Sequence, residues 1–179
     1  TMGFTITGSD RTASKITKHL ETLGIEVIYE QAAKNITPNI DFVVYTAAIS
    51  EDNPEFVRAK ELGLPMMERA SMVGQVMKNY STAIAVSGTH GKTSTTSITS
   101  HILMEAGLDP TISVGGILPA IGGNIRVGKS DTFITEACEY TNSFLKFFPT
   151  IGIILNIEAE HLDFFRDLAD VRHSFRRFA

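Results

Sequence analysis

The stretch Thr82–Ser100, TAIAVSGTHGKTSTTSITS, decides the fold of the second half of the chain. Its opening residues, TAIAVSG, are mostly alanine or β-branched and predict a strand. Residues Thr93–Ala106 predict a helix, which Gly107 terminates. A tight turn between a strand and a helix N-terminus presents backbone N–H groups that can bind an anion. The stretch therefore predicts a phosphate-binding loop.

The loop is a short variant of the usual G-x-x-x-x-G-K-[ST] pattern, because Val86 stands where that pattern has its first glycine. Gly88 and Gly91 still let the backbone turn tightly and approach phosphate oxygens. We expect Lys92 to reach the terminal phosphates and Thr93 to offer its hydroxyl to Mg²⁺. The alternative is a strand, a turn and a helix with an incidental lysine. The expected nucleotide-binding residues of the loop are Gly88, Thr89, His90, Gly91, Lys92, Thr93 and Ser94.

The composition of the 179-residue chain is that of a globular protein, with 43% hydrophobic residues. The formal net charge is −4, and no basic block could follow a nucleic-acid backbone, so we expect no nucleic-acid partner. No apolar run approaches the roughly 20 residues of a membrane helix, so we expect no membrane insertion. The single cysteine, Cys138, cannot form an internal disulfide, which favours a cytoplasmic protein.

Short apolar strands alternate with helical patterns along the chain, which predicts an α/β fold with parallel sheets. We expect a Rossmann-like domain over residues 1–80 and a phosphate-loop ATPase domain over residues 81–179. The last helical pattern reaches Ala179 without a stop signal. The chain begins on a strand with no glycine-rich turn before it, although a nucleotide-binding α/β half usually has such a turn after its first strand. Both domains are therefore expected to be truncated, the first at its first βα unit and the second in its C-terminal part.

The first half is expected to contain strands at residues 3–8, 25–29 and 41–49. A helix follows the first strand in this prediction, capped by Ser9 or Asp10 and ended by Gly24. A second helix is expected to start at Pro54 and to end at Gly63. The pattern thus places one helix between the first two strands and a second helix after the third strand.

The second half is expected to begin after a linking helix over residues 69–81. The glycine-rich segment 112–128 is expected to be mostly loop. Apolar runs predict strands at residues 131–137 and 150–156, with a short helix at 138–149 between them. Helical spacing of apolar residues predicts a last helix at residues 168–179.

The segment TEACEYTNSF carries a second group of candidate site residues. Glu136 lies at the predicted C-terminal end of a strand, where ligands bind in open parallel sheets, and could hold Mg²⁺. Glu139 lies about one helical turn further on; it could face the same site, but the sequence favours a solvated surface position. We expect Cys138 to be a packing residue rather than a nucleophile, since no neighbouring histidine would activate it.

The segment LNIEAEHLD also follows an apolar strand, so its polar residues are expected at the same edge of the sheet. His161 could bind a metal, contact a γ-phosphate or be purely structural, and the spacing alone leaves these open. The pattern is not H-E-x-x-H, so a zinc protease site is not indicated. The polar residues of the segment are Asn156, Glu158, Glu160, His161 and Asp163.

Together, the ordered motifs SGTHGKTSTT, EACEYTNSFL and NIEAEHLD resemble the Mur ligase family, the ATP-dependent amide ligases of peptidoglycan precursor synthesis. The resemblance covers nearly the whole chain. The family has a Rossmann-like domain for a UDP-sugar, a central ATPase domain and a C-terminal domain. This chain resembles most of the first domain and the front part of the second, which implies that ligase activity needs more than these residues.

The resemblance implies catalytic roles for Lys92, Glu136 and His161. Lys92 would bind the β- and γ-phosphates, Thr93 and Glu136 would hold one Mg²⁺, and His161 would serve a second metal site. Asn156 would lie near the nucleotide. The residues implied in sugar-nucleotide binding are Ser9, Asp10, Thr46, Ala47 and Asn124. The chain departs from the family pattern at Glu160, where the family commonly has aspartate, and in YEQAAKNI, where it often has Gly-His or Gly-Gln.

The activity that the resemblance implies is ligation of L-alanine to UDP-N-acetylmuramate, driven by ATP with Mg²⁺ through an acyl phosphate. The histidine of GTHGKT, the EACEY block and VVYTAAISEDNPE favour this member over the later ligases. One alternative is a related ligase that adds a peptide to the same sugar nucleotide. Another is a nucleotide-binding fragment or ATPase without ligase activity. A dinucleotide oxidoreductase is disfavoured, because no G-x-G-x-x-G is present.

Overall fold

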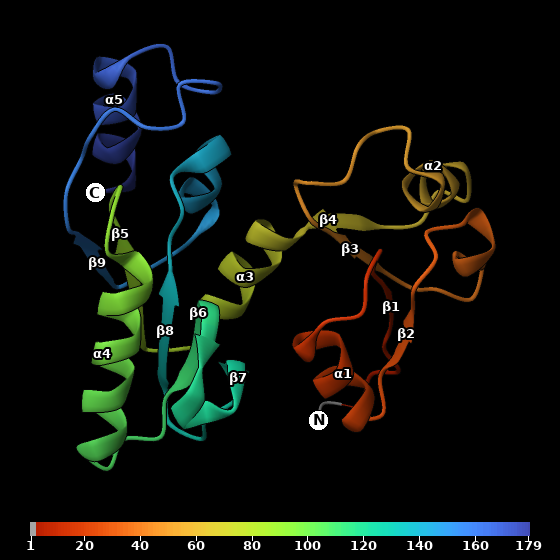
Figure 1. Ribbon diagram of the computed structural model, residues 1–179, viewed down its shortest axis with the longest axis horizontal. Helices are drawn as coiled ribbons and strands as arrows, with labels where there is room; N and C mark the ends of the chain where they lie inside the picture. The colour runs from red at the N-terminus through yellow and green to blue at the C-terminus, as the bar shows by residue number, and fades with distance from the viewer. Residues whose placement is uncertain (1–2) are drawn as a thin grey trace. The chain divides into compact units, whose positions relative to one another are not determined.

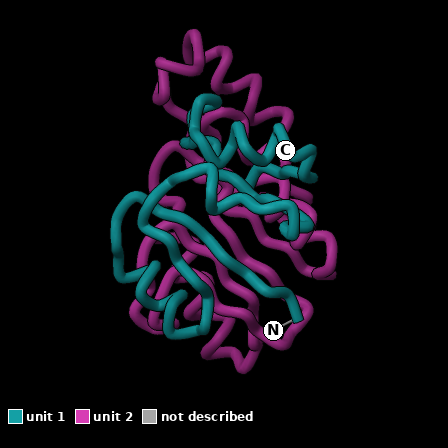
Figure 2. Tube along the Cα trace, turned by 90° about the vertical axis from the view of Figure 1, so that its right-hand side faces the viewer, with its two compact units in different colours: residues 1–69 teal, residues 70–179 magenta. Residues whose placement is uncertain are grey.

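The computed structural model describes residues 3–179, which form two compact units; along the chain, the first ends at Arg69 and the second begins at Ala70 (Figure 2). Helix α3 (Arg69–Met77) packs with the second unit, because Met77 is buried in that unit's core. The sequence placed the boundary between domains near Tyr80, after α3. The second compact unit begins earlier, at Ala70, and so includes nearly all of this helix.

The first unit contains two separate pairs of short parallel strands (Figure 1). Strand β1 (Thr7–Ser9) pairs with β2 (Glu26–Ile28), and β3 (Val43–Tyr45) pairs with β4 (Met66–Glu68). The helices of the unit are α1 (Lys15–Thr22), the 3₁₀ turn η1 (Ala33–Asn35) and α2 (Pro54–Glu61). The strands are shorter than the apolar runs predict, and β4 was not predicted.

The first helix begins later than predicted. Its cap is Ser14, not Ser9 or Asp10: the Ser14 hydroxyl accepts the Thr17 N–H at 3.1 Å, and the Thr17 hydroxyl accepts the Ser14 N–H at 2.8 Å. This reciprocal pair is a capping box, which satisfies two N–H groups that a single serine or aspartate upstream would not. The predicted end is confirmed, since Gly24 follows the helix with φ of 82°.

The second helix confirms its predicted start and end. Pro54 is its first residue, and the Asn53 side chain accepts the N–H groups of Glu55 and Phe56 at 3.0 and 3.3 Å. Proline suits this position because its missing N–H would have no partner in the helix. Gly63 follows with φ of 64°, a left-handed conformation that glycine adopts without strain.

The second unit is built on a five-stranded sheet with the order β7-β6-β8-β5-β9 (Figure 1). All neighbouring strands are parallel except β6 and β7, which are antiparallel. The strands are β5 (Thr82–Ser87), β6 (Thr111–Leu118), β7 (Gly123–Arg126), β8 (Thr132–Glu136) and β9 (Ile151–Ile154). The remaining elements are α4 (Lys92–Glu105), the 3₁₀ turns η2 (Pro119–Ile121) and η3 (Tyr140–Lys146), and α5 (Leu168–Phe178).

The prediction that residues 112–128 are mostly loop was wrong, because they form the antiparallel strands β6 and β7. Ile112 and Val114 are buried and supply an inward-facing alternation that the neighbouring glycines obscure in the sequence. The helix predicted at residues 138–149 is the 3₁₀ turn η3, in which Thr141 and Asn142 have left-handed φ values of 54° and 58°. These two residues interrupt the regular helix.

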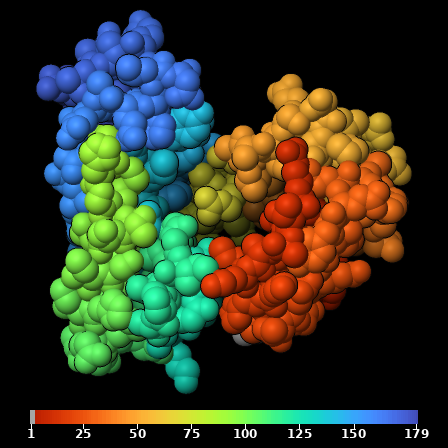
Figure 3. All heavy atoms as spheres, viewed as in Figure 1, coloured from red at the N-terminus to blue at the C-terminus, as the bar shows by residue number. Residues whose placement is uncertain are grey.

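The sheet has a hydrophobic core on each face, and β5 contributes to both by alternation. Ala83 and Ala85 face one core, which also contains Phe144 and Phe175. The ring centroids of these two phenylalanines lie 5.2 Å apart. Ile84 and Val86 face the other core, against which Leu103 and Met104 of α4 pack. The space-filling view shows side chains of α4 (green) beside those of β6 and β7 (teal) on one face of this unit (Figure 3). These two cores fix the carboxyl ends of β5, β8 and β9.

Membrane insertion was not expected from the sequence. Within residues 3–179, none of the helices has both the length and the apolar composition that crossing a membrane requires.

Candidate functional site

The predicted phosphate-binding loop lies between the end of β5 and the start of α4. Gly88 and Gly91 have φ values of 139° and 86°, so both glycines adopt conformations that other residues rarely take. A Cβ on Gly88 would lie 3.0 Å from Leu155 Cβ and 3.2 Å from the Asn156 nitrogen. The loop therefore turns sharply against the segment that follows β9.

Asn156 holds this loop through both ends of its side-chain amide. Its Oδ1 accepts the His90 N–H at 2.8 Å, and its Nδ2 donates to the His90 carbonyl at 3.0 Å. The Asn156 carbonyl also accepts the Thr89 N–H at 3.1 Å, and the Thr89 hydroxyl accepts the Glu158 N–H at 2.9 Å. The structure thus places Asn156 against the backbone of the loop, where it fixes the loop's shape.

Thr93 and Glu136 meet at the first turn of α4. The Thr93 hydroxyl donates to Glu136 Oε2 at 2.8 Å, and the Gly115 N–H of β6 donates to Glu136 Oε1 at 2.5 Å. Parallel pairing of β5 with β8 puts Glu136 opposite Val86, directly beside the loop. A hydroxyl and a carboxylate are oxygen donors of the kind that Mg²⁺ prefers, so this pair fits a magnesium site next to bound phosphates. Ser94, the next loop residue, is exposed.

Gly115 was missed by the sequence analysis, although it determines where the Glu136 carboxylate lies. A Cβ at Gly115 would lie 3.2–3.4 Å from the three carboxylate atoms of Glu136. We expect Gly115→Ala to push this carboxylate away and to weaken binding of Mg²⁺–nucleotide by roughly threefold to tenfold, about 1 kcal/mol. Calorimetric titration of the variant would measure this loss.

Gly123→Ala provides the matched control for that experiment. It changes a glycine of the adjoining strand β7 at which an added Cβ would have no atom within 4 Å. Its nucleotide affinity is expected to equal that of the wild-type chain. Equal affinity in Gly115→Ala would contradict the role given to Gly115.

Lys92 folds back over the loop and forms a buried ion pair. Its Nζ donates to the Gly88 and Thr89 carbonyls at 2.5 and 3.1 Å. The same nitrogen lies 2.9 and 3.2 Å from the two carboxylate oxygens of Glu139. The side chain of Glu139 is only 2% exposed and that of Lys92 is 16% exposed. The surface position favoured for Glu139 was therefore wrong.

The conformation of the chain after β8 explains why the sequence misplaced Glu139. In a regular helix from Cys138, the direction of each side chain would follow from the period of about 3.6 residues per turn. Instead, Thr141 and Asn142 are left-handed, and the Asn142 N–H donates to the Glu139 carbonyl at 2.8 Å. This tight turn directs the Glu139 side chain toward the interior. The pattern EACEYTNSF signals the turn only weakly: asparagine, as at Asn142, adopts the left-handed conformation occasionally, but threonine, as at Thr141, rarely does.

His161 lies near Glu139, the carboxylate that pairs with Lys92. Its Nε2 is 3.9 Å from Glu139 Oε1, and its ring is 4.6 Å from that of Tyr140. Donor atoms of Glu139, Glu160 and His161 all lie within 4.8 Å of one another, so these residues could share a cation. His161 is thus brought together with Glu139 and Glu160, and its φ of 55° marks a tight turn at this point.

Cys138 was expected to be a packing residue rather than a nucleophile, and the structure shows that the residue is exposed. The surrounding protein still removes enough water from the thiol to raise its pKa above the ordinary value, and this loss of solvation is the largest cause. A raised pKa keeps the sulfur protonated and poorly nucleophilic, so Cys138 has no activated thiolate.

The residues expected to bind the sugar nucleotide lie mostly at strand ends of the first unit. Ser9 ends β1 and its hydroxyl donates to Glu55 Oε2 at 2.5 Å. The exposed Asp10 accepts the N–H of Thr12 at 3.1 Å. Thr46 and Ala47 follow β3 and are exposed.

Asn124 belongs instead to the second unit and lies on the edge strand β7. Two strands, β6 and β8, separate β7 from β5, whose end carries the loop. The structure therefore does not bring Asn124 to the phosphate-binding loop through the sheet.

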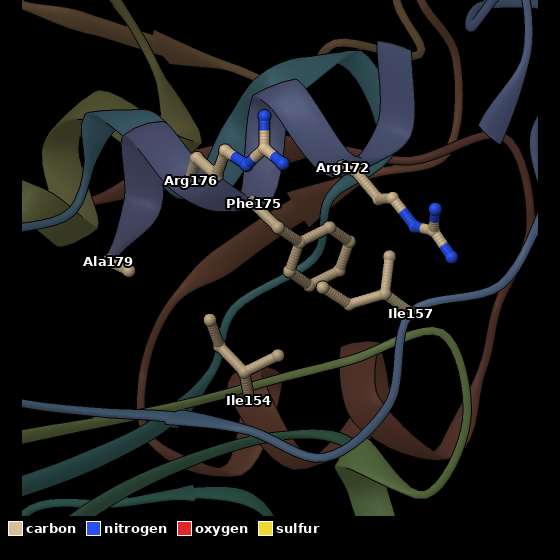
Figure 4. A pocket seen from close by; sticks show the side chains of 6 residues that line it. All are labelled: Ile154, Ile157, Arg172, Phe175, Arg176 and Ala179. Carbon is tan, nitrogen blue, oxygen red and sulfur yellow. The ribbon is translucent and has the colours of Figure 1, made fainter. Parts of the chain in front are cut away.

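A hollow in the second unit lies between β9 and α5 (Figure 4). The ring of Phe175 faces Ile154 and Ile157 there, whereas the guanidinium groups of Arg172 and Arg176 are directed away from the ring (Figure 4). None of the loop residues lines this hollow. The hollow is therefore distinct from the phosphate-binding loop, although Ile154 at the end of β9 lines it.

Comparison with family models covers both units. The description "Mur ligase family, catalytic domain" matches residues 1–81, and "Mur ligase middle domain" matches residues 86–179. The chain is 65% identical over 177 residues to a UDP-N-acetylmuramate–L-alanine ligase of Agathobacter rectalis, covering 99% of this chain and 39% of that protein. It is 56% identical over 176 residues to the ligase of the same name of Clostridium kluyveri, covering 98% and 38%.

Solved structures show the same fold. A UDP-N-acetylmuramate–alanine ligase of Thermotoga maritima matches with a TM-score of 0.88 at 31% identity, covering 96% of this chain and 40% of that one. A UDP-N-acetylmuramate:L-alanyl-gamma-D-glutamyl-meso-diaminopimelate ligase of Neisseria meningitides matches with a TM-score of 0.89 at 27% identity, covering 98% and 60%. The chain thus spans about 39% of the length of the first curated relative.

Proposed function

This chain belongs to the Mur ligase family, and we propose that it forms the sugar-nucleotide-binding and ATP-binding parts of a ligase that joins L-alanine to UDP-N-acetylmuramate. The observation that carries this proposal is the contact of Thr93 with Glu136 at the end of the phosphate-binding loop. An oxygen-donor pair beside a helix N-terminus suits a nucleotide bound with Mg²⁺. The similarity to ligases with this name favours L-alanine as the amine.

In the proposed site, the N–H groups of the loop and the start of α4 bind the phosphates of ATP. Lys92 neutralises the β- and γ-phosphates, and Thr93 with Glu136 would hold Mg²⁺ between them. His161, together with Glu139 and Glu160, would hold a second cation. When bound, these cations would neutralise phosphate charge.

The proposed reaction activates a carboxylate, because its oxygen is otherwise a poor leaving group. A lactyl carboxylate oxygen attacks the γ-phosphorus of ATP, and ADP leaves. The neutral amine of L-alanine then attacks the acyl carbon of the acyl phosphate; phosphate leaves, and the nitrogen loses a proton. The chain's contribution is to orient the reactants and to offset charge on the transferred phosphoryl group through Lys92.

We assign sugar-nucleotide binding to residues 1–80 and ATP binding to residues 81–179. Ser9, Asp10, Thr46 and Ala47 would contact the uridine and diphosphate end of the sugar nucleotide, and Asn124 the muramic acid part. We place the reaction in the cytoplasm, which suits a chain whose single cysteine is free.

A ligase that adds a peptide to the same sugar nucleotide is the second candidate. The likeness in fold to the Neisseria structure favours it, although the identity of 27% is lower than that of the L-alanine ligases. A panel that offers L-alanine, other amino acids and a tripeptide to the full-length ligase would distinguish the two. Incorporation of the tripeptide alone would favour this second candidate.

The test of the proposed function is calorimetric titration of this chain with ATP–Mg²⁺ and, separately, with UDP-N-acetylmuramate. We expect ATP to bind more tightly than AMP, since the loop recognises the phosphates beyond the first. UMP serves as the control for the sugar nucleotide. A folded chain that binds neither ATP nor UDP-N-acetylmuramate would contradict the assignment of both sites to these residues.

A further inference from the structure

The Glu139 carboxylate is a buried charge whose ion pair with Lys92 has no role in the phosphate chemistry proposed above. Its side chain is 2% exposed, and a buried carboxylate is strongly unfavourable unless a cation and hydrogen bonds compensate it. Lys92 supplies both, through distances of 2.9 and 3.2 Å to the two oxygens. The two side chains come from segments 47 residues apart, so the pair joins the loop to the turn after β8.

The ammonium of Lys92 has three N–H donors, and three groups accept them. The Gly88 carbonyl lies at 2.5 Å, the Thr89 carbonyl at 3.1 Å and the nearer Glu139 oxygen at 2.9 Å. A phosphate oxygen can gain a hydrogen bond from this nitrogen only by replacing one of these partners. The two carbonyls belong to the loop itself, so the carboxylate is the partner whose negative charge a phosphate would repel.

We propose that Glu139 is a positioning residue for the phosphate-binding lysine: it holds the Lys92 ammonium in the nucleotide-free loop and yields it to phosphate. The inference rests on the proposed nucleotide site and adds one step to nucleotide binding there, in which Lys92 exchanges Glu139 for phosphate. Glu139 acts as a stand-in anion. It keeps the Lys92 side chain ordered, so the lysine loses less side-chain entropy when the nucleotide arrives.

The same carboxylate opposes phosphate until its charge is offset. Glu139 Oε1 lies 3.9 Å from His161 Nε2, and Glu160 also lies beside them. A cation held by Glu139, Glu160 and His161 would neutralise the charge of Glu139 when Lys92 moves to the phosphate. Nucleotide without a divalent cation is therefore expected to bind weakly, because phosphate and Glu139 then compete for one ammonium.

The first experiment observes the ammonium of Lys92 directly. In the ¹⁵N spectrum of lysine-labelled chain, a side-chain NH₃⁺ that is held by three acceptors exchanges slowly with water and gives a resolved signal. Loss of the signal in Lys92→Arg assigns it. We expect this signal in the wild-type chain, its loss in Glu139→Gln, and its shift when inorganic pyrophosphate is added to the wild type.

The second experiment measures affinity for ADP by calorimetry, with and without Mg²⁺. Glu139→Gln conserves the size of the side chain and an oxygen acceptor but removes the charge. We expect its affinity for metal-free ADP to rise about tenfold, and its gain from Mg²⁺ to shrink by a similar factor. Glu105→Gln, which changes an exposed carboxylate at the other end of α4, is the matched control and is expected to behave as wild type.

Two results would overturn the proposal: a Lys92 ammonium signal that persists unchanged in Glu139→Gln, or a metal-free ADP affinity that this variant does not raise. If Glu139→Gln does not fold, the wild-type spectrum decides, and a signal that pyrophosphate leaves unmoved counts against release to phosphate. Failure of the nucleotide site has a different signature. In that case no variant binds ADP, while the ammonium signal still reports whether Glu139 holds the lysine.

Discussion

Lys92→Ala is expected to lower the affinity of this chain for ATP–Mg²⁺ by about a hundredfold. The wild-type ammonium can form charge-assisted hydrogen bonds to phosphate, each of which contributes about 1.5–3 kcal/mol, and a tenfold change corresponds to about 1.4 kcal/mol. In the full-length ligase the loss of turnover should exceed the loss of binding, because negative charge develops on the phosphoryl group as it is transferred. Calorimetry measures the first effect and ADP release the second.

The variant also leaves Glu139 buried without its cation, so stability must be measured beside affinity. Removing one partner of a buried ion pair costs about 3–5 kcal/mol. The double variant Lys92→Met with Glu139→Gln removes both charges, and it is expected to be more stable than Lys92→Ala while still failing to bind ATP tightly. Lys129→Ala, at an exposed lysine of the same unit, is the control. ATP affinity within twofold of wild type in Lys92→Ala would refute the assigned role.

The sequence predicted the framework of the second unit well, because its signals are local. Strand β5 is a run of small and β-branched residues, α4 begins at the glycine-lysine pair, and α5 shows a clear helical period. The parallel order of β5 and β8 then follows from general rules for α/β proteins and brings Glu136 to the loop. Local pattern and topology were enough to place Thr93 and Glu136 together.

The features that the sequence did not predict depend on contacts between distant residues. Strands β6 and β7 stabilise each other by pairing, although their glycines weaken any local strand signal. The position of Gly115 beside Glu136 follows from the parallel pairing of β6 with β8, which is also a contact between distant residues. Glu139 is buried because a left-handed turn and the Lys92 ammonium both favour it there, and neither is visible in the order of residues around it. A surface position was the reasonable expectation for an isolated glutamate.

The second large effect is expected from Gly74→Ala in helix α3. Alanine in a helix usually stabilises it by about 0.5–1 kcal/mol relative to glycine. Here an added Cβ would lie 2.0 Å from the Lys146 carbonyl oxygen and 3.0 Å from its carbonyl carbon, and both atoms belong to the backbone. No rotamer change can relieve such a contact, so α3 and the end of η3 must separate. The strain outweighs the helix propensity.

Separation of these elements opens the core in which Met77 of α3 and Phe144 of η3 pack. We expect Gly74→Ala to lower the free energy of unfolding by about 3 kcal/mol or more, seen as a fall in Tm of roughly 8 °C. Gln75→Ala, at the next and exposed position, changes no packing and should stay within about 0.5 kcal/mol of wild type. Thermal denaturation of both variants measures the difference.

Loss of function should accompany this loss of stability, because η3 begins directly after Glu139. A displaced η3 moves the carboxylate that pairs with Lys92, although α3 itself carries none of the proposed nucleotide-binding residues. We therefore expect Gly74→Ala to weaken ATP binding at temperatures where the chain is still folded, and Gln75→Ala to leave it unchanged. A Gly74→Ala chain as stable as wild type would mean that α3 and η3 can shift apart without cost, against the close backbone contact described above.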